Sequence, residues 1–487
     1  MNKSNPQVSR KQLSDLMMGL GVYSQDVPIT NICDDTRQLQ TGDTFLCLPR
    51  VSNKEAVIQH AINDGANAVI VVGELNKKLA VPCACLPDMG AIGLMLRRWF
   101  ETEQADVQCV GITGTDGKTS TAWMLREVLE NHVAKAWSVG TLGWMQDKEN
   151  IIDLGNTTPS LLNNHRLLCQ AQQSGIKAVV FEVSSHGIAQ SRIAGLPFAA
   201  AVWTTMGHDH LEDHGSYENY LSIKHGFIQS VAQAGGTIVA NADYVDITQA
   251  LSQVKNDVLW YSAGNATDLQ WSVTDAGVQL QSKAQTIRLQ DVPRADFHAE
   301  NLAAVALVMQ ATFDVPLEKF TYLAQHLSTP MGRLEPVSEQ VYIDYAHTAE
   351  GLQRCLQSAR KLTSNQLLLV FGCGGNRDKS KRPEMGAVAE QFADECWLTS
   401  DNPRDEQQSD IAADALAGVH YPEKIHVVED RSLAISQAVG SLLPQDVLVI
   451  AGKGHESYIE NKGNRLPWSD KAEALKALAA AEVQSCA

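Results

Sequence analysis

The sequence predicts an α/β protein of three domains. A small N-terminal α/β domain is expected before a central domain with a doubly wound, mostly parallel sheet, and a Rossmann-like α/β domain is expected at the C-terminal end. Two observations indicate this class. Short apolar runs alternate with helical patterns along nearly the whole chain, as in parallel sheets covered by helices. The 487 residues are also too many for one ordinary core.

The first predicted domain covers residues 1–101. An amphipathic helical pattern separates two buried strand patterns, and a second helix leads out of the domain. The expected strands are 43–48 and 67–73, and the expected helices are 55–66 and 93–104.

The second predicted domain covers residues 102–331. Its strand patterns are nearly continuous apolar runs, which indicates burial on both faces of the sheet. The expected strands are 107–113, 176–185, 198–205 and 235–243, and a long helix is expected at 296–313. Pro330 and Gly332 interrupt the pattern and mark the next boundary.

The third predicted domain covers residues 332–487. Its expected strands are 341–347, 366–375, 395–404, 424–430 and 446–456. Several of them end in glycine or in a polar cluster. Since ligands of open α/β sheets bind beyond the carboxyl ends of strands, these ends are where a site is expected.

Composition and charge exclude several classes of function. The net charge of −17 argues against non-specific nucleic-acid binding. The ten cysteines are scattered and lack paired zinc spacing, which favours buried thiols in a reducing compartment. The N-terminal segment has no apolar signal core, and no window approaches 18 uninterrupted apolar residues. We therefore expect a cytoplasmic protein that binds neither nucleic acid nor membrane.

A glycine-rich turn, GITGTDGKTS at 111–120, lies between an apolar strand and a helix. Backbone N–H groups and the positive end of a helix bind phosphate in such turns, Lys118 adds a charge, and the Thr119 hydroxyl can reach a magnesium ion. The turn is a variant, because Ile112 stands where the usual P-loop pattern has glycine. The pattern favours a nucleotide site over a turn without a chemical role.

Glu182 lies at the end of a predicted buried strand, where an unpaired carboxylate is costly. A bound Mg²⁺ would offset that cost, and a neighbouring lysine or arginine would do so as well. Residues 204–227 are rich in histidine and acid. They fit a second magnesium ligand, a polar surface or, without any cysteine, a zinc site.

Seven motifs then occur in the order found in Mur ligases, and the resemblance runs from about residue 28 to 470. They are GITGTDGKTS, FEVSSHGIAQSRI, GHDHLEDHGSYENYLSIK, IDYAHT, FGCGGNRDKSKRPEMG, SDNPR and AGKGHE. The resemblance implies synthesis of an amide bond with ATP and Mg²⁺. A D-Glu side-chain carboxylate of a UDP-muramoyl dipeptide would become an acyl phosphate, which the amine of meso-diaminopimelate attacks. A monomer is expected.

The resemblance also implies roles for individual residues. The catalytic residues would be Lys118, Glu182, His210 and Lys224, and the metal ligands Thr119, Glu182, His210 and Lys224 as a carbamate. ATP contacts would come from Gly114, Thr115, Asp116, Gly117, Lys118, Thr119, Ser120, His298, Asn301, Arg333, Asp344, Tyr345 and His347. Asp116 and His298 stand where relatives commonly carry asparagine. Without the resemblance, Lys224 would be interpreted as a solvated helix lysine.

Two further sets concern the substrates. The UDP-substrate residues would be Asp34, Thr36, Asn156, Thr157, Thr158, Ser184, Gln190 and Arg192, and the diaminopimelate residues Arg377, Asp401, Asn402, Pro403, Arg404, Gly452 and Glu456. Diaminopimelate differs from lysine by one carboxylate, which a guanidinium grips with two hydrogen bonds. Arg404 is predicted to bind that carboxylate. The alternative is that Arg404 lies in a turn and forms a surface salt bridge.

Several alternatives stay open, of which the other ligases and the synthetases share the expected fold. They are the ligases that add lysine, D-glutamate or D-Ala-D-Ala, the folylpolyglutamate synthetases, a P-loop kinase, and an ATP-binding regulatory protein without catalysis. DNPR together with GKGHE favours the diaminopimelate-adding type over the other ligases.

Overall fold

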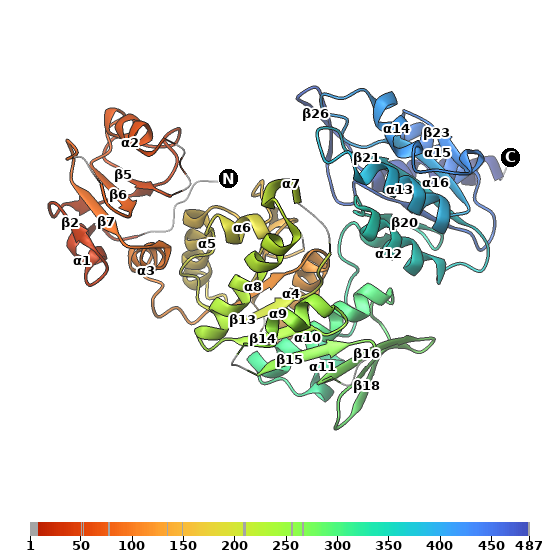
Figure 1. Ribbon diagram of the computed structural model, residues 1–487. Helices are drawn as coiled ribbons and strands as arrows, with labels where there is room; N and C mark the ends of the chain where they lie inside the picture. Colours follow the sequence, from red (N-terminus) through yellow and green to blue (C-terminus); the bar gives the residue numbers. More distant parts are fainter. Residues whose placement is uncertain are drawn as a thin grey trace. The chain divides into compact units, whose positions relative to one another are not determined.

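The computed structural model describes residues 8–49, 51, 53–75, 78–133, 135–148, 150–207, 211–254, 257–264 and 267–485 (Figure 1). The chain forms two compact units. The first contains residues 1–206, 216–260 and 307–316, and the second contains residues 207–215, 261–306 and 317–487. The α/β class and the mostly parallel central sheet are confirmed, whereas the domain boundaries near residues 102 and 332 stay predictions.

The N-terminal part of the first unit is built on a five-stranded sheet. Its strand order is β2 (Val22–Tyr23), β7 (Cys83–Leu86), β6 (Ala68–Val72), β5 (Thr44–Cys47) and β4 (Ile32–Cys33). All neighbours are parallel except β2 and β7. Its helices are α1 (Leu13–Met17), α2 (Lys54–Asn63) and α3 (Met89–Trp99), and β1 (Lys11–Gln12) pairs with β3 (Pro28–Ile29). Asp88 caps α3, so this helix begins four residues before the predicted position.

The central sheet of the first unit places the glycine-rich turn in its middle. The sheet has eleven strands, and the first seven in its order are β11 (Ile151–Ile152), β10 (Gly143–Met145), β9 (Ala136–Gly140), β12 (Ala178–Glu182), β8 (Gln108–Thr113), β13 (Phe198–Trp203) and β14 (Thr237–Asn241). β9, β12, β8, β13 and β14 run parallel to one another. β10 and β11 add an antiparallel edge next to β9. Every residue of β12 is buried, as expected of a parallel strand covered on both faces.

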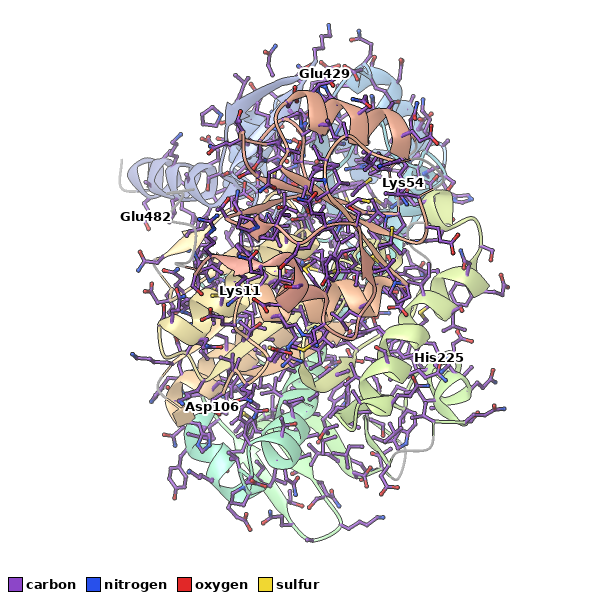
Figure 2. All side chains as sticks on the ribbon, turned by 90° about the vertical axis from the view of Figure 1, so that its left-hand side faces the viewer. Lys11, Lys54, Asp106, His225, Glu429 and Glu482 are labelled. Carbon is purple, nitrogen blue, oxygen red and sulfur yellow. The ribbon has the colours of Figure 1, made fainter. Side chains whose placement is uncertain are left out.

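Helices connect these strands. They are α4 (Lys118–Val133), α5 (Leu161–Gln173), α6 (Ser185–Ala189), α7 (Leu211–His214), α8 (Tyr217–Gln233) and α9 (Val245–Leu251). Asp106, labelled in Figure 2, precedes β8 and forms an exposed ion pair of 2.7 Å with Lys177, which precedes β12. The sequence analysis did not predict β9, β10 or β11.

β15 (Val258–Ser262) pairs in parallel with β16 (Leu269–Thr274). β17 (Gly277–Gln281) and β18 (Thr286–Leu289) follow in antiparallel pairing, and the sequence analysis missed these strands too. The predicted long helix is α10 (Asp296–Thr312), and α11 (Leu317–Leu323) comes after it.

The second unit contains a six-stranded sheet. Its order is β19 (Arg333–Pro336), β20 (Val341–Asp344), β24 (Val447–Ile450), β21 (Leu367–Cys373), β22 (Glu395–Ser400) and β23 (Ile425–Val427), all parallel except β19 with β20. The helices are α12 (Ala349–Arg360), α13 (Lys381–Phe392), α14 (Gln408–Leu416), η1 (Pro422–Lys424), α15 (Arg431–Gly440) and α16 (Asp470–Ser485). A hairpin of β25 (Tyr458–Asn461) and β26 (Asn464–Pro467) precedes α16.

A fully buried ion pair ties the strand ends of this sheet together. Arg431 and Asp470 are 2.7 Å apart and both are inaccessible to solvent. The same guanidinium donates to the carbonyl oxygens of Ser400 and Ala451, at the ends of β22 and β24. The contacts satisfy the buried charge and fix the two strand ends that carry predicted site residues.

No helix in the described part of the chain has the length and hydropathy needed to cross a membrane.

Candidate active site

The glycine-rich turn leaves β8 and enters α4 directly at Lys118. Gly114 has φ of +152° and Gly117 has φ of +85°, and a Cβ added to Gly114 would lie 2.0 Å from Thr204 Oγ1. The glycines are therefore required by backbone conformation and by close approach. Lys118 Nζ donates to the carbonyl oxygens of Gly114 and Thr115, each at 2.8 Å, so the cation lies over the turn. Ser120, in the first turn of α4, is buried.

Two threonines after β13 hold this turn, and the sequence analysis did not single them out. Thr205 accepts from the backbone N–H of Asp116 at 2.8 Å, and its carbonyl oxygen accepts from the N–H of Thr115. Thr204 Oγ1 donates to the Asp116 carbonyl oxygen at 2.5 Å. Hydroxyls from the neighbouring strand thus fix the loop backbone.

Glu182 ends β12 and is 3% exposed. Its Oε2 accepts from Thr119 Oγ1 at 2.8 Å and from Thr141 Oγ1 at 3.0 Å, and its Oε1 accepts from the Thr141 N–H at 3.0 Å. The partners are hydroxyl and amide groups, whereas the alternative was a lysine or arginine. A carboxylate beside a P-loop threonine hydroxyl is a donor set that suits Mg²⁺, which uses one or two carboxylates together with phosphate oxygens and water.

Lys224 lies on α8 and is 1% exposed, so its interpretation as a solvated helix lysine is wrong. Its Nζ donates to the Gly114 carbonyl oxygen at 2.9 Å and lies 4.5 Å from the centre of the Tyr220 ring. The Tyr220 hydroxyl is 3.2 Å from Thr115 Oγ1. Lys224 is therefore in direct contact with the glycine-rich turn at 111–120, called the phosphate turn below.

The predicted metal ligand His210 lies outside the described residues, as does His208. Among the residues that the structure describes, no group of three His, Cys, Asp or Glu side chains is arranged to hold a metal.

Four of the predicted UDP-substrate residues meet next to Glu182. Thr158 Oγ1 donates to the Glu182 carbonyl oxygen at 2.9 Å and is 3.0 Å from Ser184 Oγ. Arg192 donates to the Thr158 carbonyl oxygen at 2.7 Å and grips Gln190 Oε1 with two nitrogens. Ser184 also caps α6, since its hydroxyl accepts from the Gly187 N–H.

Of the other UDP-substrate predictions, Thr157 has its hydroxyl 3.1 Å from that of Thr141. Asn156 is exposed, and Asp34 and Thr36 lie in the loop between β4 and β5. Arg166 of α5, which the sequence analysis missed, donates to the Ile32 carbonyl oxygen at 3.2 Å. Burial lowers the pKa of Arg166, and the charge of Asp34 opposes that shift.

In the second unit, the predicted nucleotide residues surround the end of β20. Asp344 is buried and accepts from the N–H groups of Leu334 and Ala346, each at 2.7 Å, and its burial raises its pKa. The Arg333 guanidinium lies 4.8 Å from the centre of the Tyr345 ring. His347 is exposed, with its ring 4.7 Å from that of Tyr345.

His298 and Asn301 are one turn apart on α10 and almost fully buried. His298 Nε2 and both side-chain polar atoms of Asn301 have no hydrogen-bond partner among the described residues. Burial lowers the pKa of His298 to about 3, so its ring is neutral near pH 7. Unsatisfied buried polar atoms are costly, and a ligand edge with donors and acceptors would satisfy them.

Arg404 follows β22 with φ of +51°, a left-handed conformation that is unfavourable for arginine. Its backbone N–H donates to the Glu460 carbonyl oxygen, and its guanidinium donates to the Gly375 carbonyl oxygen at 2.7 Å. Within the described chain this is the one hydrogen bond of the guanidinium, and it forms no ion pair there. The described residues therefore give no support to the alternative of a surface salt bridge. Pro403 is buried, and Arg377 is exposed.

A buried cation organises the rest of the predicted amino-acid pocket. Lys453 is inaccessible to solvent, and its Nζ donates to Glu456 Oε2 at 2.8 Å and to Asn402 Oδ1 at 3.1 Å. Asp401 is buried, which raises its pKa, and its Oδ2 has no hydrogen-bond partner among the described residues. A Cβ on Gly452 would lie 2.6 Å from that oxygen, so only glycine leaves it space. The sequence analysis did not assign Lys453.

Arg382 of α13 supports the loop that carries Arg404. It is buried, and it donates to both oxygens of Glu406 at 2.8 and 3.0 Å and to the Gly374 carbonyl oxygen. The hydrogen bonds from Arg382 and Lys379 lower the pKa of Glu406 to about 2.

Comparison with known proteins gives two domain matches. Residues 112–309 match the Mur ligase middle domain, and residues 332–454 match the Mur ligase glutamate ligase domain.

Relatives extend the similarity over nearly the whole chain. The UDP-N-acetylmuramoyl-L-alanyl-D-glutamate–2,6-diaminopimelate ligase of Ectopseudomonas mendocina is 34% identical over 478 residues, which are 94% of this chain and 96% of the relative. The ligase of the same name from Coxiella burnetii is 32% identical over 96% of this chain and 99% of its own. A solved structure of a protein of that name covers 97% of this chain and 100% of its own, with a TM-score of 0.70 and 28% identity.

The ion pair between Arg382 and Glu406 should make a pH-dependent contribution to the free energy of unfolding. The folded-state pKa of Glu406 is about 2, below its ordinary value of 4.5, so the contribution is fully present above pH 4.5 and is lost as the pH falls toward 2. The difference in unfolding free energy between the wild type and Glu406→Gln should therefore shrink across that window. Urea denaturation from about pH 7 to about pH 3 measures it.

Glu423→Gln, which removes an exposed carboxyl from the same unit, is the matched control for that experiment. A stability difference for Glu406→Gln that stays constant or grows on acidification would contradict the assignment.

Proposed function

This chain belongs to the Mur ligase family, and from that premise we propose that it catalyses the ATP-dependent addition of diaminopimelate to UDP-N-acetylmuramoyl-L-alanyl-D-glutamate. The product is a precursor of peptidoglycan. The observation in the structure that carries the proposal is the buried hydrogen bond between Thr119 of the phosphate turn and Glu182. It joins a phosphate-binding loop to a carboxylate with magnesium-binding chemistry.

The reaction needs an activated carboxyl group, because oxide is a poor leaving group. Transfer of the terminal phosphoryl group of ATP to the D-Glu side-chain carboxylate gives an acyl phosphate and ADP. The amine of diaminopimelate then attacks the carbonyl carbon, inorganic phosphate leaves with the C–O bonding pair, and the nitrogen loses a proton. The phosphate turn and the N-terminal N–H groups of α4 bind the phosphates, and Lys118 adds a positive charge.

Mg²⁺ would be held by the Thr119 hydroxyl and Glu182, and it would screen the negative charges of two anions that must meet. We further propose His210 and a carbamate on Lys224 as ligands of a second ion. Carbamylation joins the neutral amine to CO₂ with loss of a proton and turns this position into an anion. The buried contact of Lys224 with the Gly114 carbonyl oxygen places it beside the phosphate turn, which supports the proposal.

The muramoyl dipeptide is proposed to bind along Thr157, Thr158, Ser184 and Arg192. Their hydroxyl and guanidinium groups suit a sugar-peptide with carboxylates. Thr158 contacts Ser184 and donates to the backbone carbonyl oxygen of Glu182, which supports a substrate surface next to the proposed metal-binding carboxylate. Gln190, Asn156, Asp34 and Thr36 stay proposed contacts of the same substrate.

In the second unit, Arg404 is proposed to bind the distal carboxylate of diaminopimelate, with Arg377, and Glu456 to bind an amine. The left-handed backbone of Arg404 and its lack of an ion pair within the described residues support this role. His298 and Asn301 are proposed to bind the adenine ring, because their orphaned polar atoms match a base edge. Substrates of these classes place the protein in the cytoplasm, and we propose that it acts as a monomer.

Phosphate release tests the function. The purified chain with ATP, Mg²⁺ and UDP-muramoyl dipeptide should release phosphate when diaminopimelate is added, and far less when lysine replaces it. Preference for lysine would make the chain a lysine-adding ligase. A stable phosphorylated product without need for an amine would indicate a kinase, and ATP binding without phosphate release would indicate a regulatory protein.

Arg404→Ala should raise the KM for diaminopimelate while leaving the KM for ATP nearly unchanged. Losing a charge-assisted pair costs about 2–5 kcal/mol, which is at least about 30-fold in KM. Arg465→Ala is the matched control, since Arg465 is an exposed arginine of the adjacent hairpin. An unchanged KM for diaminopimelate in Arg404→Ala would reassign Arg404.

Lys224→Ala should abolish phosphate release, and short carboxylic acids should restore part of it by occupying the place of the carbamate. His225→Ala is the control, since His225 is the next residue on α8 and is labelled in Figure 2. Normal turnover of the alanine variant at position 224 would remove the carbamate from the mechanism.

A further inference from the structure

Thr141 forms two hydrogen bonds with the Glu182 carboxylate, whereas Thr119 of the glycine-rich turn forms one. Its backbone N–H donates to Oε1 at 3.0 Å and its hydroxyl donates to Oε2 at 3.0 Å, so one residue holds both carboxylate oxygens. Thr119 contributes only the hydroxyl bond to Oε2, at 2.8 Å.

The position of Thr141 is fixed by the sheet. It directly follows β9, which pairs with β12 in parallel register, Val139 opposite Phe181. Glycine at position 140 leaves room for the Glu182 carboxylate beside the β9 backbone, since a Cβ there would lie 2.0 Å from Glu182 Oε1. Gly140 also pairs with Gly143 of β10, which turns the chain tightly at this point. The carboxylate can therefore lie against the β9 backbone and receive the next N–H.

The hydroxyl protons around Thr141 can be assigned by counting. Thr141 Oγ1 has one proton, and it goes to Glu182 Oε2. Thr141 Oγ1 also lies 3.1 Å from Thr157 Oγ1, so the proton of that second hydrogen bond must come from Thr157. The chain of donation runs from Thr157 through Thr141 to Glu182. The Thr157 hydroxyl is left with lone pairs only, so it can accept a hydrogen bond but has no proton to donate to a ligand.

We propose that Thr141 is the positioning residue for the metal-binding carboxylate, and that it links this carboxylate to the substrate residue Thr157. The proposal rests on the proposed function in one respect, that Glu182 binds a divalent cation. An ion held by the Thr119 oxygen would use a lone pair of that hydroxyl. The two donors of Thr141 would orient both carboxylate oxygens of Glu182, as the partners behind metal ligands do in general.

The test compares Thr141→Val with Thr141→Ser in the full-length protein. Valine keeps the shape and the backbone N–H but removes the hydroxyl, whereas serine keeps both donors. The readout is binding of a fluorescent ADP analogue, titrated with MgCl₂ in the absence of the other substrates. Thr141→Val should raise the Mg²⁺ concentration at half-saturation about 10- to 100-fold, and Thr141→Ser should stay within about twofold of the wild type.

Two further measurements separate positioning from damage to the fold. The thermal midpoint of Thr141→Val should fall by only a few degrees, about the loss of one buried hydrogen bond, and its affinity for the analogue without Mg²⁺ should be unchanged. A wild-type Mg²⁺ dependence in Thr141→Val would overturn the proposal. An equal loss in the serine variant would overturn it too, because the hydroxyl would then not be the group that matters.

The outcomes distinguish this proposal from the proposed function. Wild-type protein that binds the analogue equally with and without Mg²⁺ would overturn the role of Thr141 together with the metal site. Wild-type protein with Mg²⁺-dependent binding but no ligation of any amino acid would overturn only the ligase function, and the comparison of the valine and serine variants would still decide the role of Thr141.

Discussion

A carboxylate buried at the end of a parallel strand is the constraint on which the first unit depends. Glu182 is 3% exposed, and an ionised group in such a place is unfavourable unless hydrogen bonds or a cation stabilise it. The surrounding sequence meets this need with the Thr119 hydroxyl and with both donors of Thr141. The glycine-rich turn and the end of β9 therefore converge on this side chain, and Thr158, a proposed substrate contact, donates to the backbone carbonyl oxygen of Glu182.

The phosphate turn itself is held by its neighbours rather than by its own residues. Thr204 and Thr205 bind the backbone of Asp116, and Lys224 binds the carbonyl oxygen of Gly114. These contacts use up backbone groups on one side of the loop. The lysine side chain over the turn and the N-terminal end of α4 give the other side of the loop a positive potential, which favours an anion.

A buried cation, Lys453, organises the polar groups of the second unit, whereas in the first unit the buried group is the Glu182 carboxylate. Lys453 is wholly buried, and Glu456 and Asn402 satisfy it, so the polar groups at the ends of β22 and β24 form one connected network. The buried ion pair of Arg431 and Asp470 holds the same strand ends, because Arg431 also donates to their carbonyl oxygens. A connected buried network is rigid, because breaking one member leaves the others unpaired. Rigidity of this kind supports the proposed amino-acid pocket, which would have to distinguish diaminopimelate from lysine by one carboxylate.

The sequence by itself determined the α/β class, the order of the main strands, and the residue types at the strand ends, because apolar periodicity and glycine patterns are local properties. It also placed Lys118, Thr119 and Glu182 in one motif-rich region. It did not reveal β9, whose short run mixes tryptophan and serine, and it therefore missed Gly140 and Thr141. Only the tertiary structure decided that Lys224 is buried and that Thr141 holds Glu182, because burial and hydrogen bonding depend on which distant segments lie side by side.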